Sequence, residues 1–238
     1  RGNAPYADPP AGMAWMHQAA AAGYGPAMCA LGRHYEQGIH VERIPLSALN
    51  WYREAADAGE VCGFLELGRA YEDGSGLPAD SVQAMQWYRR AAERGEAQAY
   101  WRMGNLLRDG SAGKPEPAKA AEMYEKALAM GFLRAAGSLG LLLLEGSGDL
   151  EAKPSKAIVL FSRAPDAPES LLGLGHAHRL GIVVPRDEEK ALALYRRAAD
   201  AGLRDAFLQL ASLYAGGLGV PPDEAQAFSW YMKAALAG

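Results

Sequence analysis

Three glycine-rich segments are the first places in this sequence where chemistry could occur, because backbone N–H groups in such loops can bind phosphate. They are Gly74-Ser75-Gly76, Gly146-Ser147-Gly148 and Gly216-Gly217-Leu218-Gly219. A phosphate-binding loop of this kind follows a strand and contains Gly-Lys-Ser/Thr. None of the three segments has either feature, so we interpret them as turns between helices.

Two histidines lie close together and could in principle bind a metal ion. His176 and His178 are two residues apart, and on a helix this spacing turns their side chains about 200° away from each other. They therefore do not share a metal ion. His178 occupies the position of Tyr35 and Tyr71 in the repeats described below, which predicts a packing role, whereas we expect His176 to be exposed.

The remaining reactive residues do not form a catalytic arrangement. Cys29 and Cys62 are too few for a disulfide scaffold and are not spaced as metal ligands. We expect two buried or half-buried thiols, with a single disulfide between neighbouring repeats as the alternative. No cysteine or serine has an identifiable base, and Glu188 and Glu189 adjoin a helix start, where they favour its dipole. We expect a chain that is not an enzyme and needs no cofactor or metal.

The composition supports folding and argues against two classes of partner. Half of the 238 residues are apolar, which suffices for a sizeable core. The formal net charge of -4 leaves no excess of positive charge for phosphates, so nucleic acid is not expected as a partner. No apolar run reaches the roughly 18 residues needed to cross a bilayer. The chain starts at Arg1 rather than at Met, as it would after removal of a signal peptide or lipid anchor.

Three sets of residues recur at a common interval of about 36 residues, which indicates an array of repeats. The first set is a closing glycine, found at Gly23, Gly59, Gly95, Gly131, Gly202 and Gly238. The second set is a glycine within an earlier helix, replaced once by alanine, at Gly32, Gly68, Gly104, Gly140, Gly175 and Ala211. The third set is an aromatic residue of a later helix, at Tyr52, Tyr88, Tyr124, Phe161, Tyr195 and Tyr231.

The segment from residue 61 to residue 95 shows what one repeat contains. Two helices flank a Gly/Pro-rich turn, and their small and aromatic residues are three or four positions apart, which places them on one apolar face. These residues are Gly63, Leu67, Gly68, Tyr71, Trp87, Tyr88, Ala91, Ala92 and Gly95. Small residues let the helices approach closely, and the closing glycine can adopt the left-handed conformation at a helix end.

Helix caps set the repeat boundaries. Asp80, Asp187 and Asp223 lie where a side chain can cap the second helix. Asp8 lies two periods before Asp80, which predicts a leading half repeat over residues 8–23. Full repeats are predicted over 25–59, 61–95, 97–131, 133–168, 169–202 and 204–238, within a single domain over 1–238. The fourth repeat ends in a proline-containing segment instead of the closing glycine, so we expect an irregularity near residues 160–170. No polar cap follows Gly238, which would be explained by a longer parent protein or by a partner covering this end.

The motifs Leu67-Gly68-x-x-Tyr71 and Trp87-Tyr88-x-x-Ala91-Ala92-x-x-Gly95, together with the period, resemble the Sel-one-like repeat family of tetratricopeptide-like repeats. The resemblance covers almost the whole chain. It implies an all-α fold, a right-handed α-solenoid of stacked helix-turn-helix repeats. It also implies protein–protein interaction and a bacterial periplasmic or envelope location, because many relatives are scaffolds or adaptors found there. Met103 and Met123 depart from the motifs, as does the end of the fourth repeat.

A partner would bind on the concave surface, which the first helices line in such arrays. We count positions from the small residue that begins each first helix. The residues 2, 6 and 9 positions later point about 180–240° around the helix, away from the packed face. A protein-binding groove is predicted there, with Trp101, Arg108, Leu141, Leu144 and Leu172 at its centre. Arg33 and Arg69 flank this centre, and His176 is a further partner-binding residue. The alternative is that the apolar residues of the groove pack between adjacent repeats.

The function predicted from these observations is a non-catalytic protein-binding scaffold or adaptor, with another protein as the partner. One alternative is a dedicated inhibitor or immunity protein that occludes a toxin or enzyme. Another alternative is an envelope module that binds carbohydrate or peptidoglycan, with Trp101 as the sugar-stacking residue.

Overall fold

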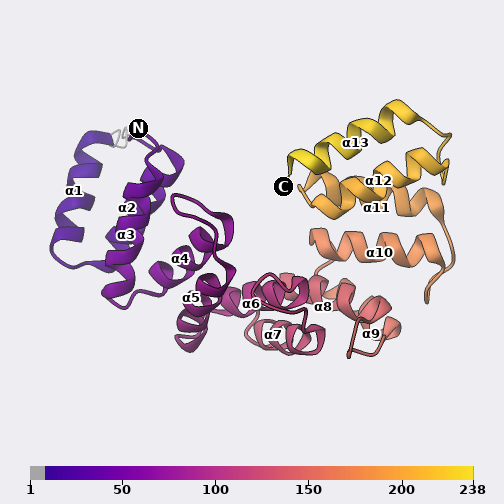
Figure 1. Ribbon diagram of the computed structural model, residues 1–238, viewed down its shortest axis with the longest axis horizontal. Coiled ribbons are helices and arrows are strands. Elements are labelled where there is room, and N and C mark those ends of the chain that lie inside the picture. Colours follow the sequence, from indigo (N-terminus) through magenta and orange to yellow (C-terminus); the bar gives the residue numbers. More distant parts are fainter. Residues whose placement is uncertain (1–8, 238) are drawn as a thin grey trace, which may run out of the picture. The chain divides into compact units, whose positions relative to one another are not determined.

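Helices joined by short turns make up the chain in the computed structural model, which describes residues 9–237 (Figure 1). The chain divides into two compact units, residues 1–115 and 116–238. The first unit contains α1 (Pro9–Ala21), α2 (Gly25–Gln37), α3 (Pro45–Asp57), α4 (Val61–Asp73), α5 (Ser81–Glu93) and α6 (Ala97–Asp109). The second contains α7 (Pro117–Ala129), α8 (Arg134–Glu145), α9 (Pro154–Arg163), α10 (Pro168–Leu180), α11 (Glu188–Asp200), α12 (Arg204–Gly216) and α13 (Glu224–Leu236). The predicted all-α repeat fold is confirmed, and the single domain over 1–238 stays a prediction.

Aspartate side chains begin three of the second helices, as predicted. The Asp80 carboxylate accepts hydrogen bonds from the Val82 and Gln83 backbone N–H groups, both at 3.0 Å. Asp187 and Asp223 cap α11 and α13 in the same way, each through the N–H three residues later. Each cap stabilises its helix by about 1 kcal/mol. Asp8, the predicted cap of the half repeat, lies outside the described residues.

The three glycine-rich segments lie at helix ends, as predicted. Gly74 follows α4 with φ +71° and Gly217 follows α12 with φ +64°. Glycine adopts this left-handed conformation without the steric cost that a Cβ atom imposes. Gly146 follows α8 and also has a positive φ, +71°. These segments therefore reverse the chain between paired helices.

Within a repeat, the first helix packs against the second through a glycine that faces an aromatic ring. A Cβ atom added at Gly68 would lie only 2.4 Å from the Tyr88 ring. The same arrangement pairs Gly32 with Tyr52, Gly140 with Phe161, and Gly175 with Tyr195. These four rings are at most 2% exposed. The recurring glycine is therefore required by the ring that lies against it.

The fourth repeat is irregular, as its prolines predicted. Helix α9 has 10 residues, whereas most of the described helices have 13. It ends before Pro165, and Pro168 then begins α10. Here α10 also packs directly on α8, where a Cβ atom at Gly137 would lie 2.9 Å from the Ser170 backbone nitrogen.

Each unit has its own apolar core. In the first unit, Met13, Met28 and Leu31 pack with Ala20 and Ala55 at the start of the array. In the second unit, the leucines of α10, α11 and α12 surround the fully buried Tyr195. Over residues 9–237, none of the helices is both long and apolar enough to cross a membrane.

Candidate functional site

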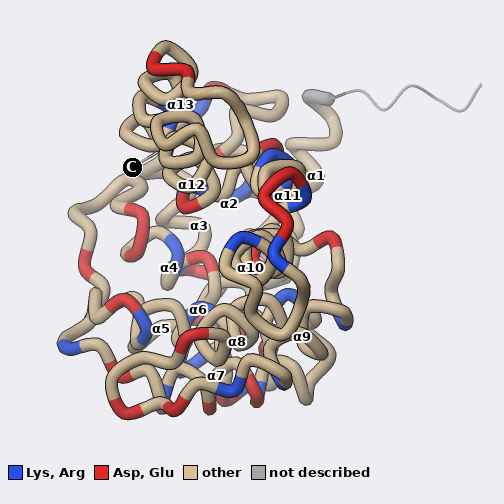
Figure 2. Tube along the Cα trace, turned by 90° about the vertical axis from the view of Figure 1, so that its right-hand side faces the viewer, with Lys and Arg blue, Asp and Glu red and all other residues tan. Residues whose placement is uncertain are grey.

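A set of charged side chains lies on the first helices of the first unit, and we call it the charged face. It comprises Arg33, Glu36, Glu66, Arg69, Glu72 and Arg102. Arg33 is exposed, and the other five are half-buried. Figure 2 shows both signs of charge along α4, which supplies Glu66, Arg69 and Glu72. A partner with a complementary charge pattern can recognise charges that are partly exposed and fixed in position.

Glu36 is the centre of the first half of this face. Its carboxylate accepts a hydrogen bond of 3.0 Å from the Tyr52 hydroxyl and an ion pair from Arg69 of the next repeat. Arg69 also donates to the Glu66 carboxylate at 2.8 Å. Burial, together with the nearby Glu66 and Glu36 carboxylates, raises the pKa of Tyr52 well above its usual range. Tyr52 therefore remains a hydrogen-bond donor at every physiological pH.

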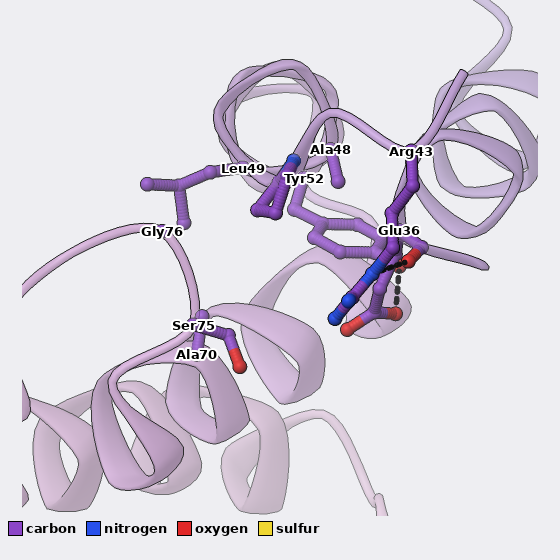
Figure 3. A pocket seen from close by; sticks show the side chains of 9 residues that line it. Glu36, Arg43, Ala48, Leu49, Tyr52, Ala70, Ser75 and Gly76 are labelled. Carbon is purple, nitrogen blue, oxygen red and sulfur yellow. Dashed lines mark hydrogen bonds between the residues drawn. The ribbon is translucent and has the colours of Figure 1, made fainter. Parts of the chain in front are cut away.

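A small recess lies beside Glu36 (Figure 3). Its volume is about 170 Å³, and it is lined by residues of α2, α3 and α4 and of the turns before α3 and after α4. The Glu36 carboxylate and the Arg43 guanidinium lie on one side, and Leu49 lies on another (Figure 3). Arg43 donates to the Glu36 carbonyl oxygen at 3.0 Å, which holds it at the rim. The recess can receive one side chain of a partner.

The second half of the charged face repeats the pattern one period later. The Tyr88 hydroxyl donates to the Glu72 carboxylate, and Arg102 of the following repeat pairs with the same carboxylate at 3.3 Å. Burial and the charge of Glu72 raise the pKa of Tyr88 well above its usual range. A buried tyrosine, a carboxylate and an arginine thus link consecutive repeats twice in this unit.

The predicted apolar centre does not lie on the surface. The exposed fractions of Trp101, Leu144 and Leu172 are 6%, 3% and 2%. Leu141 is half-buried and packs against the core of the second unit. The residue two positions into a first helix was expected to point outward, but Cys29, at this position in the first full repeat, is also buried. Trp101, Leu144 and Leu172 therefore do not form a free surface.

The basic members of the predicted site remain accessible in part. Arg33 is exposed, and the side chains of Arg69 and Arg108 are 27% and 32% exposed. Arg108 donates to the Asp109 carboxylate at 2.6 Å. His176 is half-buried rather than exposed, and its burial lowers its pKa. The structure brings Arg33 and Arg69 together on the charged face, and partner binding by all of these residues stays a prediction.

The expectation of two thiols is wrong, because Cys29 and Cys62 form a disulfide. Their Cα atoms are 6.3 Å apart, and the bond links α2 to α4. These are the first helices of neighbouring repeats, which pack side by side. Their contact could not be read from the sequence, because a separation of 33 residues says nothing by itself about distance.

The two histidines of α10 have different degrees of burial. His178 is 8% exposed and donates from Nδ1 to the Pro185 carbonyl oxygen at 3.2 Å, which confirms its packing role. Over residues 9–237, no group of three or more His, Cys, Asp or Glu residues is arranged to hold a metal ion.

The sequence interpretation missed the partners of the tyrosine hydroxyls. Positions nine residues into the first helix were assigned to a free surface, yet Glu36 and Glu72 accept hydrogen bonds from Tyr52 and Tyr88. The sequence did contain a signal for these hydrogen bonds, because the residue 16 positions before each of these two tyrosines is a glutamate. In the one repeat where the aromatic is a phenylalanine, Phe161, the residue nine positions into the first helix is Leu144, which lies 17 residues before the ring.

The comparison with known families agrees with this architecture. The Sel1 repeat matches seven times, over residues 2–24, 25–60, 65–96, 97–132, 134–164, 168–203 and 206–238. The chain therefore belongs to the Sel1 repeat family. Repeats of this family generally mediate protein–protein interactions and are typically non-catalytic. Among curated protein sequences, none matches this chain.

Solved structures with the same fold come from several bacteria. A Sel1 repeat protein from Oxalobacter formigenes is 29% identical, with 89% of this chain and 85% of that chain covered and a TM-score of 0.72. The protective antigen c5321 of uropathogenic Escherichia coli is 30% identical over 95% of this chain, with a TM-score of 0.65. This chain spans 49% of that antigen. The immunity protein Pa5087 of Pseudomonas aeruginosa is 19% identical, with coverage of 89% and 82% and a TM-score of 0.58. This last likeness concerns the fold alone.

Proposed function

We propose that this chain is a non-catalytic scaffold or adaptor that binds a partner protein through the charged face of its first unit. The observation that carries the proposal is that the charged side chains are held in place between repeats while they stay partly exposed. Glu36 is fixed by Arg69 and Tyr52, and the side chains of this ion pair are 21% and 27% exposed. Side chains that are already ordered lose little conformational entropy when a partner binds.

The recess beside Glu36 adds shape to this charge pattern. Binding energy at protein interfaces is concentrated in a few side chains that enter well-packed pockets. The recess combines the Glu36 carboxylate with the apolar side chains of Pro45 and Leu49. A partner side chain with an apolar stem and a basic end would match both features. Alternating charges around the recess would fix the orientation of the partner.

The test is affinity purification of a partner with the full chain, followed by calorimetric titration of variants. Arg33→Glu reverses an exposed charge that lies one helical turn from Glu36. We expect this variant to weaken binding about tenfold or more and to reduce its salt dependence. Arg89→Glu reverses an exposed charge on the second helix α5 and is the matched control, with unchanged affinity expected.

Equal effects of Arg33→Glu and Arg89→Glu would contradict the assignment of the charged face. Recovery of a single tightly bound toxin or enzyme would instead favour an inhibitor or immunity function. The glycan alternative depended on Trp101, which is 6% exposed and lies beneath the Arg102 guanidinium, 5.2 Å from its ring centre. Binding to isolated glycans, measured alongside the protein partner, would support that alternative.

A further inference from the structure

Helices α10 and α11 hold a cluster of polar atoms that lacks the partner found in the first unit. In the first two full repeats, the tyrosine hydroxyl of the second helix donates to a carboxylate 16 residues earlier, at Glu36 and at Glu72. The residue 16 positions before Tyr195 is Arg179. The charge at this position is therefore reversed, and the carboxylate that would accept from the hydroxyl is missing.

The structure shows the consequence of this reversal at three atoms. The Tyr195 hydroxyl, the Arg179 Nε and the His176 Nε2 are all buried and have no hydrogen-bond partner among the described residues. Tyr195 is 0% exposed, so solvent does not replace the missing partner. The His176 and Tyr195 rings meet edge to face with centroids 5.6 Å apart. Leaving buried polar groups without partners costs about 1–3 kcal/mol for each group.

The charges around the cluster leave Arg179 without an ion pair. No carboxylate among residues 9–237 lies within ion-pair distance of it. Glu145 at the end of α8 and Asp205 at the start of α12 act on the cluster only through longer-range electrostatics, and Glu145 is exposed. Burial lowers the pKa of His176, which favours a neutral ring. Burial also raises the pKa of Tyr195 to about 12, although the adjacent Arg179 guanidinium acts to lower it, so its hydroxyl keeps its proton.

We propose that Arg179 and Tyr195 form an anchor for a carboxylate supplied by a protein partner, with His176 beside it. The inference rests on the proposed protein-binding function and identifies a second contact point, in the second unit. A carboxylate accepts several hydrogen bonds at once and carries the charge that Arg179 lacks. It would restore the tyrosine–carboxylate–arginine arrangement that Glu36 and Glu72 complete internally. Arg179 and His176 are each half-buried, so the group reaches them from the surface after a small side-chain movement.

The carboxylate can come from an acidic side chain or from the end of a chain, and two probes distinguish these sources. Acetyl-Gly-Asp-Gly-amide offers only a side-chain carboxylate, and acetyl-Gly-Gly-Gly offers only a terminal one. Acetyl-Gly-Asn-Gly-amide has no charge and is the control. The readout is the NMR signal of the Arg179 Nε–H group in the full chain during titration. We expect a saturable shift with one or both carboxylate peptides and none with the asparagine peptide.

Variants separate the anchor from a general effect of charge. Tyr195→Phe keeps the ring and removes only the hydroxyl, and it should weaken carboxylate binding about tenfold. Tyr24→Phe removes the hydroxyl of a tyrosine that is 60% exposed and belongs to neither site, and it should leave peptide affinity unchanged. Arg179→Lys keeps the charge but loses the Nε–H donor, so it should weaken binding as well. Circular dichroism confirms that each variant is folded.

Several outcomes would overturn the anchor. One is an Arg179 signal that moves equally with the asparagine peptide, or that does not move at all. Another is peptide binding that is seen with Glu145→Gln but not with the unaltered chain. Glu145 would then be the carboxylate that normally occupies the anchor. If a purified partner binds Tyr195→Phe and the unaltered chain equally well, the anchor fails and the proposed function stands. If the peptides bind but no partner protein is found, the anchor stands and the proposed function fails.

Discussion

At the scale of single residues, the position nine residues into the first helix matches the aromatic of the second helix in three repeats. Where the aromatic carries a hydroxyl, the partner is the Glu36 or Glu72 carboxylate in the first two full repeats. Phe161 has no hydroxyl and is fully buried, and the equivalent residue is the buried Leu144. A buried hydroxyl requires a partner, whereas a buried phenyl ring requires only apolar contact.

This coupling predicts that Tyr88→Phe destabilises the protein. The substitution removes the hydrogen bond to Glu72 but leaves the carboxylate paired with Arg102. We expect a loss of about 1–2 kcal/mol in the free energy of unfolding, measured by urea denaturation. Tyr24→Phe, at a tyrosine that is 60% exposed, is the control and should change little.

The reverse substitution tests the same coupling from the other side. Phe161→Tyr adds a buried hydroxyl to the repeat in which Leu144 stands at the position of Glu36 and Glu72. A buried hydroxyl without a partner costs about 1–3 kcal/mol. If Tyr88→Phe and Phe161→Tyr were both neutral, the coupling would have no energetic role.

At the scale of elements, the contact between paired helices depends on the recurring glycine. Glycine is a poor helix former, and alanine at an open helical site is favoured by about 1 kcal/mol. At Gly68 the gain is opposed, because an added Cβ atom would lie 2.4 Å from the Tyr88 ring, which is 0% exposed and cannot move aside cheaply. In the last repeat, alanine replaces the glycine at Ala211, and there Tyr231 is 47% exposed.

We therefore predict opposite signs for the same substitution at two glycines. Gly68→Ala should lower the free energy of unfolding by about 1–3 kcal/mol, because the core around Tyr88 is overpacked. Gly12→Ala lies on α1 with nothing within 4 Å of the new Cβ atom, and it should raise stability by up to about 1 kcal/mol. Thermal unfolding of both variants checks this, and stabilisation by Gly68→Ala would show that the ring does not require the glycine.

At the scale of the whole molecule, the two units are stabilised in different ways. Ion pairs link repeats in both units, for example Arg69–Glu36 in the first and Arg134–Glu169 in the second. Only the first unit contains the Cys29–Cys62 disulfide. Disulfides persist under oxidising conditions and are opened under reducing conditions. A redox change should therefore act on one unit only.

Reduction of the disulfide should loosen the first unit and leave the second unchanged. The bond closes a separation of 33 residues, and opening it should cost roughly 3–4 kcal/mol of stability. Hydrogen exchange measured with and without reductant is expected to show faster exchange in α2, α3 and α4 and no change over residues 116–238. Thiol alkylation followed by mass spectrometry verifies the state of both cysteines. Uniform loosening of the whole chain would contradict the assignment of the bond to one unit.

The sequence by itself determined the repeat, because period, caps and glycines are local properties of the chain. Asp80 caps its helix and Gly74 ends one as their types predicted, and the prolines after Arg163 shorten α9. Such residues act through backbone conformation within a few positions. Their effects can therefore be read without knowing what packs against them.

Only the tertiary structure decided which side of each first helix is covered. Trp101 and Leu172 were expected to point away from the packed face, yet both are buried. The pairing of Cys29 with Cys62, and the unpartnered state of the Arg179 and Tyr195 polar atoms, also depend on contacts between repeats. Burial is a property of surfaces that meet across the stack. A helical period describes directions around one helix and does not specify what lies in each direction.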